Sequence, residues 1–317
     1  MIVKDFIIKL SEHVIQIVND NFDFVAAKKR TGISHGGDTQ FSIDEVAEEA
    51  VYEYLKTKGS EYAYYSEDRR LITFQENPRY VLIIDPIDGT RGAAANLECC
   101  CFSIAVAPFF PEVTIQEVEF GLLYEFKSKN MFFAEKNGPL VVKGAEIRRS
   151  SNVMTDQMFW SMEFNGHPSR IITFALGDLI DSSANRGGVF IFNSSTFSIS
   201  RIFTGQLDAY IDIGNRITRE NPHTHEAFRR VGNGKFLHLF PYDIAAAVFL
   251  AQKAGVAITD AFGESLGKTK LLDISPENLQ SCVAAANWEL HREILERIRW
   301  VKDESDFEKI RQLEKNL

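Results

Sequence analysis

The hydrophobic positions of the chain predict helices near its beginning and throughout its second half. Apolar residues recur at intervals of three and four over residues 2–18, the spacing of one face of an amphipathic helix. The Ser-x-x-Glu sequence from Ser42 to Glu45 is typical of a capping box and predicts a helix to about Lys56. The same periodicity predicts helices over residues 196–203 and 242–253, closed by Gly205 and Gly255, and from residue 289 onward.

Short runs rich in β-branched and aromatic residues predict strands between these helices. They cover residues 62–65, 80–84, 101–107, 117–124, 131–135, 186–190, 208–212, 256–259 and 282–285. Because strands and helices do not alternate regularly, the pattern favours a layered α+β arrangement over a TIM barrel. Residues 214–235 are polar and rich in Gly, Asn, Arg and His, so they are predicted to form an insertion loop.

Length and composition narrow the class of protein. The 317 residues suffice for two closely packed αβ halves, which we expect at residues 1–185 and 186–317. The net charge of −9 and the lack of a basic stripe argue against a nucleic-acid partner. No apolar run is long enough for a membrane span, and residues 1–10 do not resemble a signal peptide. Three consecutive cysteines, Cys99 to Cys101, suit neither a metal clip nor a secreted disulfide framework, so we expect a cytoplasmic protein.

The most informative segment is Asp-Pro-Ile-Asp-Gly-Thr at residues 85–90, where an apolar strand ends. Pro86 fixes its own φ and restricts Asp85, while Gly89 permits positive φ or a close backbone approach. Such a turn can direct both carboxylates and the Ile87 carbonyl at a hard cation such as Mg²⁺. Free amides at Gly89 and Thr90 would suit a phosphate. The Asp-x-x-Asp spacing alone also occurs in turns with solvated acids.

This segment resembles the signature of the inositol monophosphatase/fructose-1,6-bisphosphatase superfamily, the lithium-sensitive, magnesium-dependent phosphomonoesterases. Three further segments resemble family motifs in the expected order: Ser66-Glu67-Asp68, residues 207–212, and residues 241–255, where Tyr242 replaces the usual Trp. The resemblance runs from about residue 40 to 296 and weakens over 144–185 and 214–235. It implies a layered αβαβα sandwich of the sugar-phosphatase type, similar to the archaeal bifunctional members.

The resemblance also implies a metal site with two to three Mg²⁺ ions, which Mn²⁺ could replace. Glu67, Asp85 and the Ile87 carbonyl would bind one ion. Asp85, Asp88 and Asp243 would bind a second, with Asp85 bridging, and Glu67 could help to hold a third.

Catalytic and substrate-binding residues follow from the same resemblance. Asp44 and Thr90 would activate the attacking water beside Glu67, although Asp44 has an equally good role as a favourable charge in the first turn of a helix. The phosphate and the substrate would contact Asp88, Gly89, Thr90, Asp212 and Arg216. The stretch Asn193-Ser194-Ser195 could face substrate, and core-edge packing explains it equally well.

The expected activity is hydrolysis of a small sugar or cyclitol phosphate, with inositol 1-phosphate as the first candidate substrate. Fructose 1,6-bisphosphate, or both substrates, fits as well, and a 3′-phosphoadenosine nucleotidase fits less because no adenine-binding insertion is evident. A protein that binds metal or phosphate without catalysis would have lost a ligand or Thr90, and all are present. Family members are commonly homodimers or homotetramers.

Overall fold

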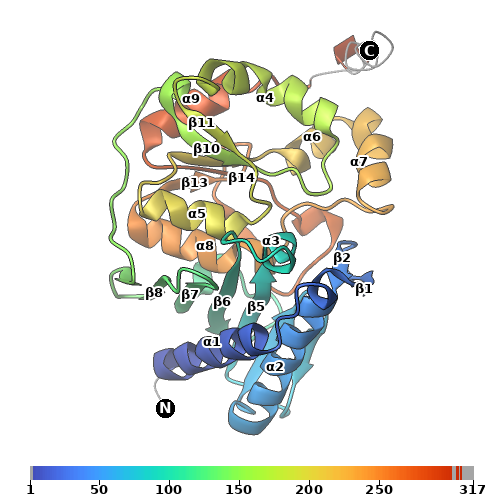
Figure 1. Cartoon of the computed structure of the whole chain (residues 1–317), viewed down its shortest axis with the longest axis vertical. Helices are drawn as coiled ribbons and strands as arrows, with labels where there is room; N and C mark the ends of the chain where they lie inside the picture. Colours follow the sequence, from blue (N-terminus) through green and yellow to red (C-terminus); the bar gives the residue numbers. More distant parts are fainter. Residues whose placement is uncertain (1–2, 302–304, 307, 309–317) are drawn as a thin grey trace.

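The computed structural model describes residues 3–301, 305–306 and 308, and it forms five layers (Figure 1). Helices α1 (Val3–Asp20) and α2 (Ser42–Lys58) cover the outer face of a seven-stranded sheet. Helices α5 (Ser195–Phe203) and α8 (Pro241–Ala254) lie between this sheet and a five-stranded sheet. Helices α4 (Ser169–Ser183) and α9 (Trp288–Arg297) cover the far side. The predicted αβαβα sandwich is confirmed.

Both sheets are mixed, as the irregular alternation of elements predicted. The large sheet has the order β4-β3-β5-β6-β7-β8-β9, and only β3 and β5 pair in parallel. Its strands are β3 (Tyr62–Ser66), β4 (Arg70–Thr73), β5 (Tyr80–Asp88), β6 (Cys101–Pro108), β7 (Phe120–Glu125), β8 (Met131–Glu135) and β9 (Val141–Lys143). The small sheet has the order β11-β10-β12-β14-β13. Its strands are β10 (Phe159–Met162), β11 (Gly188–Phe190), β12 (Ala209–Asp212), β13 (Ala257–Thr259) and β14 (Cys282–Ala285).

The change from one sheet to the other comes earlier than the predicted boundary at residue 185. Strand β10 pairs in parallel with both β11 and β12, so residues from about 159 onward belong to the small sheet. Helix α8 packs against β5, β6 and β7 of the large sheet, although it follows the small sheet's β12 in the chain. The two halves therefore share the middle layer.

Strand β5 is the element that delivers the Asp-Pro-Ile-Asp segment. Val81 and Ile83 pack into the core around α5 and α8, while Leu82 and Ile84 pack into the core beneath α1 and α2. A strand buried on both faces needs such a continuous apolar run. Its pairing with β6 shifts by one residue at Pro86, because proline has no N–H with which to continue the ladder.

The region predicted as an insertion loop is largely helical, so this prediction is wrong. Helices α6 (Gly214–Glu220) and α7 (His225–Val231) flank a 3₁₀ turn at Pro222–Thr224. Ile217 and Phe228 anchor these helices in the core, and two apolar residues are too few to give a sequence periodicity. The helix predicted from the Ser42–Glu45 capping box is present, but the box begins one residue earlier. The Phe41 N–H donates to Asp44 Oδ2 at 2.9 Å, so Phe41 takes the position predicted for Ser42 and Asp44 the position predicted for Glu45.

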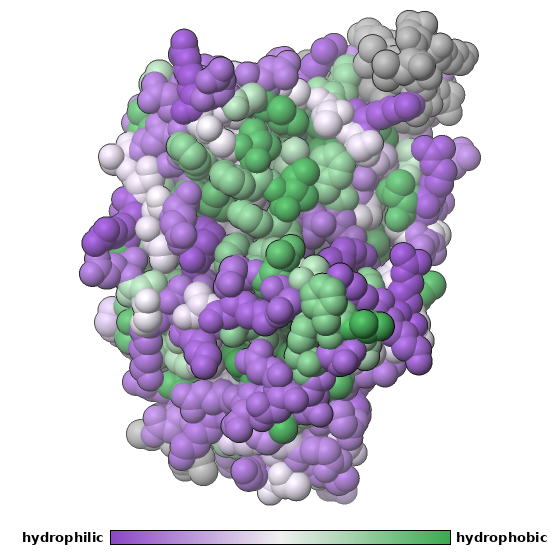
Figure 2. Space-filling model, viewed as in Figure 1, coloured by the Kyte–Doolittle hydropathy of each residue, from purple (hydrophilic) through white to green (hydrophobic). Residues whose placement is uncertain are grey.

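A short hairpin and a short helix complete the elements around the site. A hairpin of β1 (Arg30–Ile33) and β2 (Thr39–Phe41) precedes α2, and the short helix α3 (Thr90–Ala94) follows β5. Figure 2 shows apolar side chains gathered on the face of the small-sheet half. No helix among the described residues has the length and hydropathy needed to cross a bilayer.

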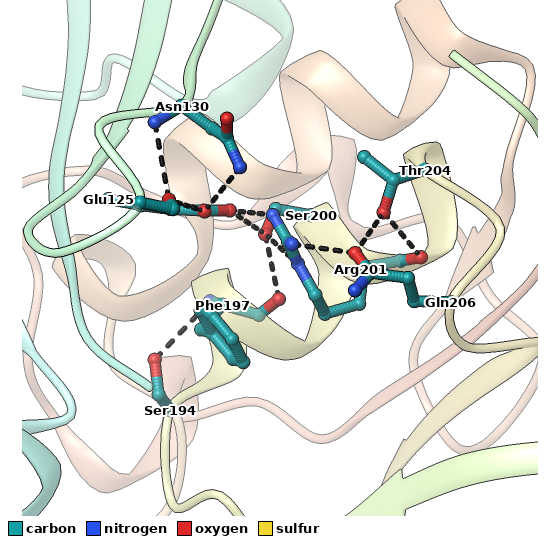
Figure 3. A network of polar contacts seen from close by, with 9 residues as sticks. Glu125, Asn130, Ser194, Phe197, Ser200, Arg201, Thr204 and Gln206 are labelled. Atoms are coloured by element: carbon teal, nitrogen blue, oxygen red, sulfur yellow. Dashed lines mark hydrogen bonds and ion pairs between the residues drawn. The ribbon is translucent and has the colours of Figure 1, made fainter. Parts of the chain in front are cut away.

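A buried ion pair joins the large sheet to the middle layer (Figure 3). Glu125, at the end of β7, is fully buried and accepts a hydrogen bond from Nη2 of Arg201 in α5. The Ser200 hydroxyl and the Asn130 amide donate to the same carboxylate, each at 3.0 Å. Arg201 Nη1 also donates to Gln206 at 2.6 Å. The charges are thus fully compensated by hydrogen bonds, as burial requires.

We expect Glu125→Gln to lower the free energy of unfolding by about 3–5 kcal/mol, because it leaves the Arg201 charge buried without a counter-charge. The matched control is Glu146→Gln, which removes an ion pair with Arg148 whose side chains are 73% and 74% exposed. Glu146→Gln should lower the free energy of unfolding by less than about 1 kcal/mol. Urea unfolding of both variants measures the difference, and equal small losses would contradict the role given to Glu125.

Candidate active site

A cavity opens where the two sheets and the middle layer meet. Asp85 and Asp88 reach it from the bulge of β5, and Glu67 reaches it from the end of the adjacent parallel strand β3. Asp243 reaches it from the first turn of α8. Of the other residues predicted for the site, Ile87, Gly89, Thr90 and Asp212 also line the cavity.

Asp88 is held by the beginning of α5. Its Oδ2 accepts hydrogen bonds from the Ser194 hydroxyl at 2.7 Å, the Thr196 N–H at 2.7 Å and the Thr196 hydroxyl. The Ser195 hydroxyl donates to the Asp243 carbonyl at 2.8 Å. The beginning of α5 thus orients the Asp88 carboxylate and contacts the backbone of Asp243, and Thr196 is a site residue that the sequence did not reveal.

Asp85 and Asp243 each have one backbone donor. The Ile87 N–H donates to Asp85 Oδ1 at 3.0 Å, and the Phe240 N–H donates to Asp243 Oδ2 at 2.7 Å. Asp243 thereby occupies the same position in α8 that Asp44 occupies in α2, where a carboxylate stabilises the helix beginning. Both the structural and the chemical roles weighed for Asp44 are compatible with this placement.

Gly89 has the backbone conformation that its place in the segment predicted. Its φ is +90°, and a Cβ there would lie 2.5 Å from the Cys99 carbonyl oxygen. Helix α3 begins at the next residue, Thr90, whose hydroxyl donates to the Ile87 carbonyl at 3.2 Å and hydrogen-bonds with Asp44. The turn therefore brings Thr90 beside Asp44, although Asp44 itself does not line the cavity.

The four acids repel one another. Burial, followed by the charges of Asp88, Asp243 and Glu67, raises the pKa of Asp85 well above its usual range. Burial also raises the pKa of Glu67 and Asp243 well above the usual range, and neighbouring acids add to the effect. The pKa of Asp88 is raised by burial and lowered by its donors from α5. The four carboxyl groups can therefore all be ionised only if a positive charge lies among them.

The side chains suit a hard divalent cation in type, because they offer an all-oxygen donor set and their charges need compensation. Within the described residues, no three His, Cys, Asp or Glu side chains already converge into a metal cage. One oxygen each of Asp88 and Asp243 is held by protein donors. The four residues thus suit divalent cations because they offer oxygen ligands and line the same cavity. To coordinate one ion together, their carboxylates would have to move closer to one another.

Two arginines near the site have different surroundings. Arg91 lines the cavity and donates to both oxygens of Asp38, at 2.7 and 3.0 Å. Arg216, predicted to contact substrate, does not line the cavity. Its guanidinium donates to the Ala261 carbonyl at 2.8 Å and lies 3.7 Å from the centre of the Trp300 ring. The expectation for Arg216 is corrected because aromatic stacking holds its charge elsewhere.

The fold agrees with the comparisons to known proteins. The model of the inositol monophosphatase family matches residues 3–302, and the chain belongs to this family of phosphoric monoester hydrolases.

Similar sequences include two curated archaeal proteins named fructose-1,6-bisphosphatase/inositol-1-monophosphatase. The one from Methanothermobacter thermautotrophicus is 25% identical over 262 residues, covering 81% of this chain and 82% of that protein. The one from Archaeoglobus fulgidus is 26% identical over 276 residues, covering 86% of this chain and 88% of that protein.

Among solved structures, the extragenic suppressor protein SuhB from Bartonella henselae has a TM-score of 0.68 at 15% identity, covering 94% of this chain and 98% of that one. An IMPase from Thermotoga maritima has a TM-score of 0.64 at 19% identity, covering 98% and 100%.

The raised pKa values predict how stability depends on pH. Burial raises the pKa of Asp44, Glu163 and Asp212 to about 7 and that of Glu48 to about 8. Above the unfolded pKa of about 4, the folded state binds more protons than the unfolded state, so stability falls as pH rises through these values. We expect the Tm of the metal-free protein to drop between about pH 4, near the unfolded pKa, and about pH 8, where these four groups are ionised in the folded state as well.

Magnesium should counteract this loss, because a cation binds the charged form of the carboxylates. Differential scanning fluorimetry with and without Mg²⁺ measures both effects. A Tm that rises with pH without metal, or a stabilisation by Mg²⁺ that is larger at pH 6 than at pH 9, would contradict the assignment of buried, repelling acids.

Proposed function

We propose that this protein hydrolyses small sugar or cyclitol phosphate monoesters with the help of Mg²⁺. The observation that carries the proposal is the placement of Glu67, Asp85, Asp88 and Asp243 around one cavity beside Thr90. These residues and the Ile87 carbonyl would hold two to three Mg²⁺ ions, with Mn²⁺ as a substitute. When bound, the ions supply the positive charge that stabilises phosphoryl oxygens and a departing alkoxide.

The chain's own groups would position the attacking water. The Thr90 hydroxyl lies between the Ile87 carbonyl and the Asp44 carboxylate, so its lone pairs can accept a hydrogen bond from water. Burial raises the pKa of Asp44 to about 7, which suits a group that accepts a proton near neutral pH. Glu67, which lines the cavity as Thr90 does, completes the proposed catalytic set with these two residues.

The phosphate would lie against Asp88, Gly89 and Thr90, with Asp212 on the side of the alcohol. Inositol 1-phosphate is the first candidate substrate, since the matching family model is that of inositol monophosphatases. Fructose 1,6-bisphosphate is the second candidate, because the archaeal relatives carry both activities in their names.

We place the enzyme in the cytoplasm as a homodimer or homotetramer. The edge of the small sheet supports such an assembly, because Phe190 at the end of β11 and Ile191 directly after it are 37% and 49% exposed.

Replacing Asp88 tests the proposed metal site. We expect Asp88→Asn to lower kcat/KM for inositol 1-phosphate by at least about 100-fold, since it removes a carboxylate charge that would hold a cation beside the phosphoryl group. The fold should persist, because the amide retains an oxygen for the donors of α5 and relieves the repulsion with Asp85. Phosphate release with saturating Mg²⁺ and circular dichroism measure both effects. Asp181→Asn, at an exposed position in α4, is the matched control. Near-full activity of Asp88→Asn would refute the proposed site.

A further inference from the structure

The turn between β1 and β2, residues 34–38, reaches the acids of the cavity. Asp38 lines the cavity, and the hydroxyl of the buried Ser34 forms a hydrogen bond with Glu67. Figure 1 shows the hairpin of β1 and β2 where the two halves of the sandwich meet. The turn is therefore part of the surroundings of Glu67, although it lies more than 25 residues before it in the chain.

The geometry of the turn makes Ser34 a hydrogen-bond donor. Its Oγ accepts from the backbone N–H groups of Gly37, at 3.2 Å, and Asp38, at 3.1 Å. The Ser34 N–H donates to the Asp38 carbonyl at 2.8 Å, which closes the turn. A hydroxyl group has two lone pairs and one proton. Because both lone pairs face backbone donors, the Ser34 proton is left for the Glu67 carboxylate.

Asp38 fastens the turn to two other segments. Its carboxylate accepts from both Nη atoms of Arg91 in α3, at 2.7 and 3.0 Å, and from the Asn165 amide at 2.9 Å. Asn165 belongs to the loop after β10 of the small sheet. A bidentate pair of an arginine with a carboxylate fixes the relative orientation of both groups. The turn is thus tied to the helix that begins at Thr90 and to the small-sheet half.

The segment after α7 holds the same turn from outside the cavity. Lys235 Nζ donates to the His35 carbonyl at 2.6 Å, and the Asn233 amide donates to the Gly37 carbonyl at 3.3 Å. Neither Lys235 nor Asn233 lines the cavity. The stem of Lys235 lies so close to Gly37 that a Cβ at Gly37 would be 2.8 Å from Lys235 Cδ. The end of the region 214–235 therefore supports the turn that carries Ser34.

Glu67 is oriented differently from the other three acids of the cavity. Backbone N–H groups and the beginning of α5 orient those three, whereas the hydroxyl of Ser34 bonds with Glu67. We infer that Ser34 is a positioning residue for Glu67 and that Lys235 keeps Ser34 in place. The inference rests on the proposed function, in which Glu67 holds a cation. Hydrogen-bond partners orient metal ligands, and losing one typically costs about 10- to 100-fold in affinity for the metal.

Replacing Ser34 tests its role with the full chain and Mg²⁺ as the only ligand. We expect Ser34→Ala to raise the Mg²⁺ concentration that gives half of the maximal rise in Tm by about 10-fold. Ser34→Thr, which retains the hydroxyl, should restore the wild-type Mg²⁺ requirement. With saturating Mg²⁺, kcat for inositol 1-phosphate should change by less than about 3-fold in both variants, because a bound cation then orients Glu67. Differential scanning fluorimetry measures the Mg²⁺ requirement, and phosphate release measures kcat.

Ser265→Ala is the matched control for this experiment. The Ser265 hydroxyl accepts from the Gly267 N–H at 3.2 Å, in a turn that does not line the cavity. Its replacement removes a similar hydrogen bond without affecting an acid of the cation site, so the Mg²⁺ requirement should stay unchanged.

Lys235→Met separates positioning from charge by the sign of its effect. The change removes the donor to the His35 carbonyl and one positive charge, and it keeps most of the apolar stem beside Gly37. Loss of the charge alone would favour a bound cation and lower the Mg²⁺ requirement. We expect the requirement to rise by about 3-fold, because a lost hydrogen bond of ordinary strength loosens the turn. Arg230→Met, which removes the same charge from an exposed position of α7, is the control and should not raise it.

Each outcome decides a different statement. An unchanged Mg²⁺ requirement in Ser34→Ala, or an equal rise in Ser34→Thr, would overturn the role of Ser34. A loss of kcat at every Mg²⁺ concentration with an unchanged requirement would show a purely structural role and overturn it as well. A lower or unchanged requirement in Lys235→Met would overturn the role of Lys235. If Mg²⁺ does not stabilise the wild-type protein, and no phosphate is released from inositol 1-phosphate, fructose 1,6-bisphosphate or p-nitrophenyl phosphate, the proposed function fails, and the inference with it.

Discussion

The structure around the cavity depends on the repulsion among four carboxylates that the fold forces together. Glu67, Asp85 and Asp243 have strongly raised pKa values because burial and neighbouring acids oppose their ionisation. A protein without a use for this arrangement would be more stable with neutral side chains there. The proposed role of Mg²⁺ and the expected loss of stability as pH rises both follow from the cost of ionising buried acids.

The middle layer keeps these acids in place. Helix α8 supplies Asp243, and the beginning of α5 holds Asp88 through Ser194 and Thr196. The far end of α5 is fixed to β7 of the large sheet by the buried pair of Arg201 with Glu125 (Figure 3). Since both sheets pack against this layer, the position of the acids depends on the whole sandwich and not on the β5 loop alone.

The sequence predicted those features that local chemistry determines. Strand β5 was visible as an apolar run that ends before Asp85 and Pro86, and Gly89 was expected to permit a positive φ or a close backbone approach, both of which the structure shows. Thr196 and Ser34 were not identified as site residues, because their roles come from contacts between segments far apart in the chain.

The predictions for Arg216 and for residues 214–235 failed for the same reason, because contacts between distant segments determine both. Arg216 looked suited to a phosphate, but its distant aromatic neighbour Trp300 decides its orientation. Residues 214–235 are polar enough for a loop, yet the buried contacts of Ile217 and Phe228 stabilise two short helices.

Anomalous diffraction from a crystal grown with Mn²⁺ and inorganic phosphate tests the central claim most directly. The expected result is at least two manganese peaks within about 2.0–2.3 Å of carboxylate oxygens of Glu67, Asp85, Asp88 and Asp243, with phosphate beside Thr90. Manganese bound elsewhere, with these four side chains still separated and the cavity occupied by water alone, would contradict it.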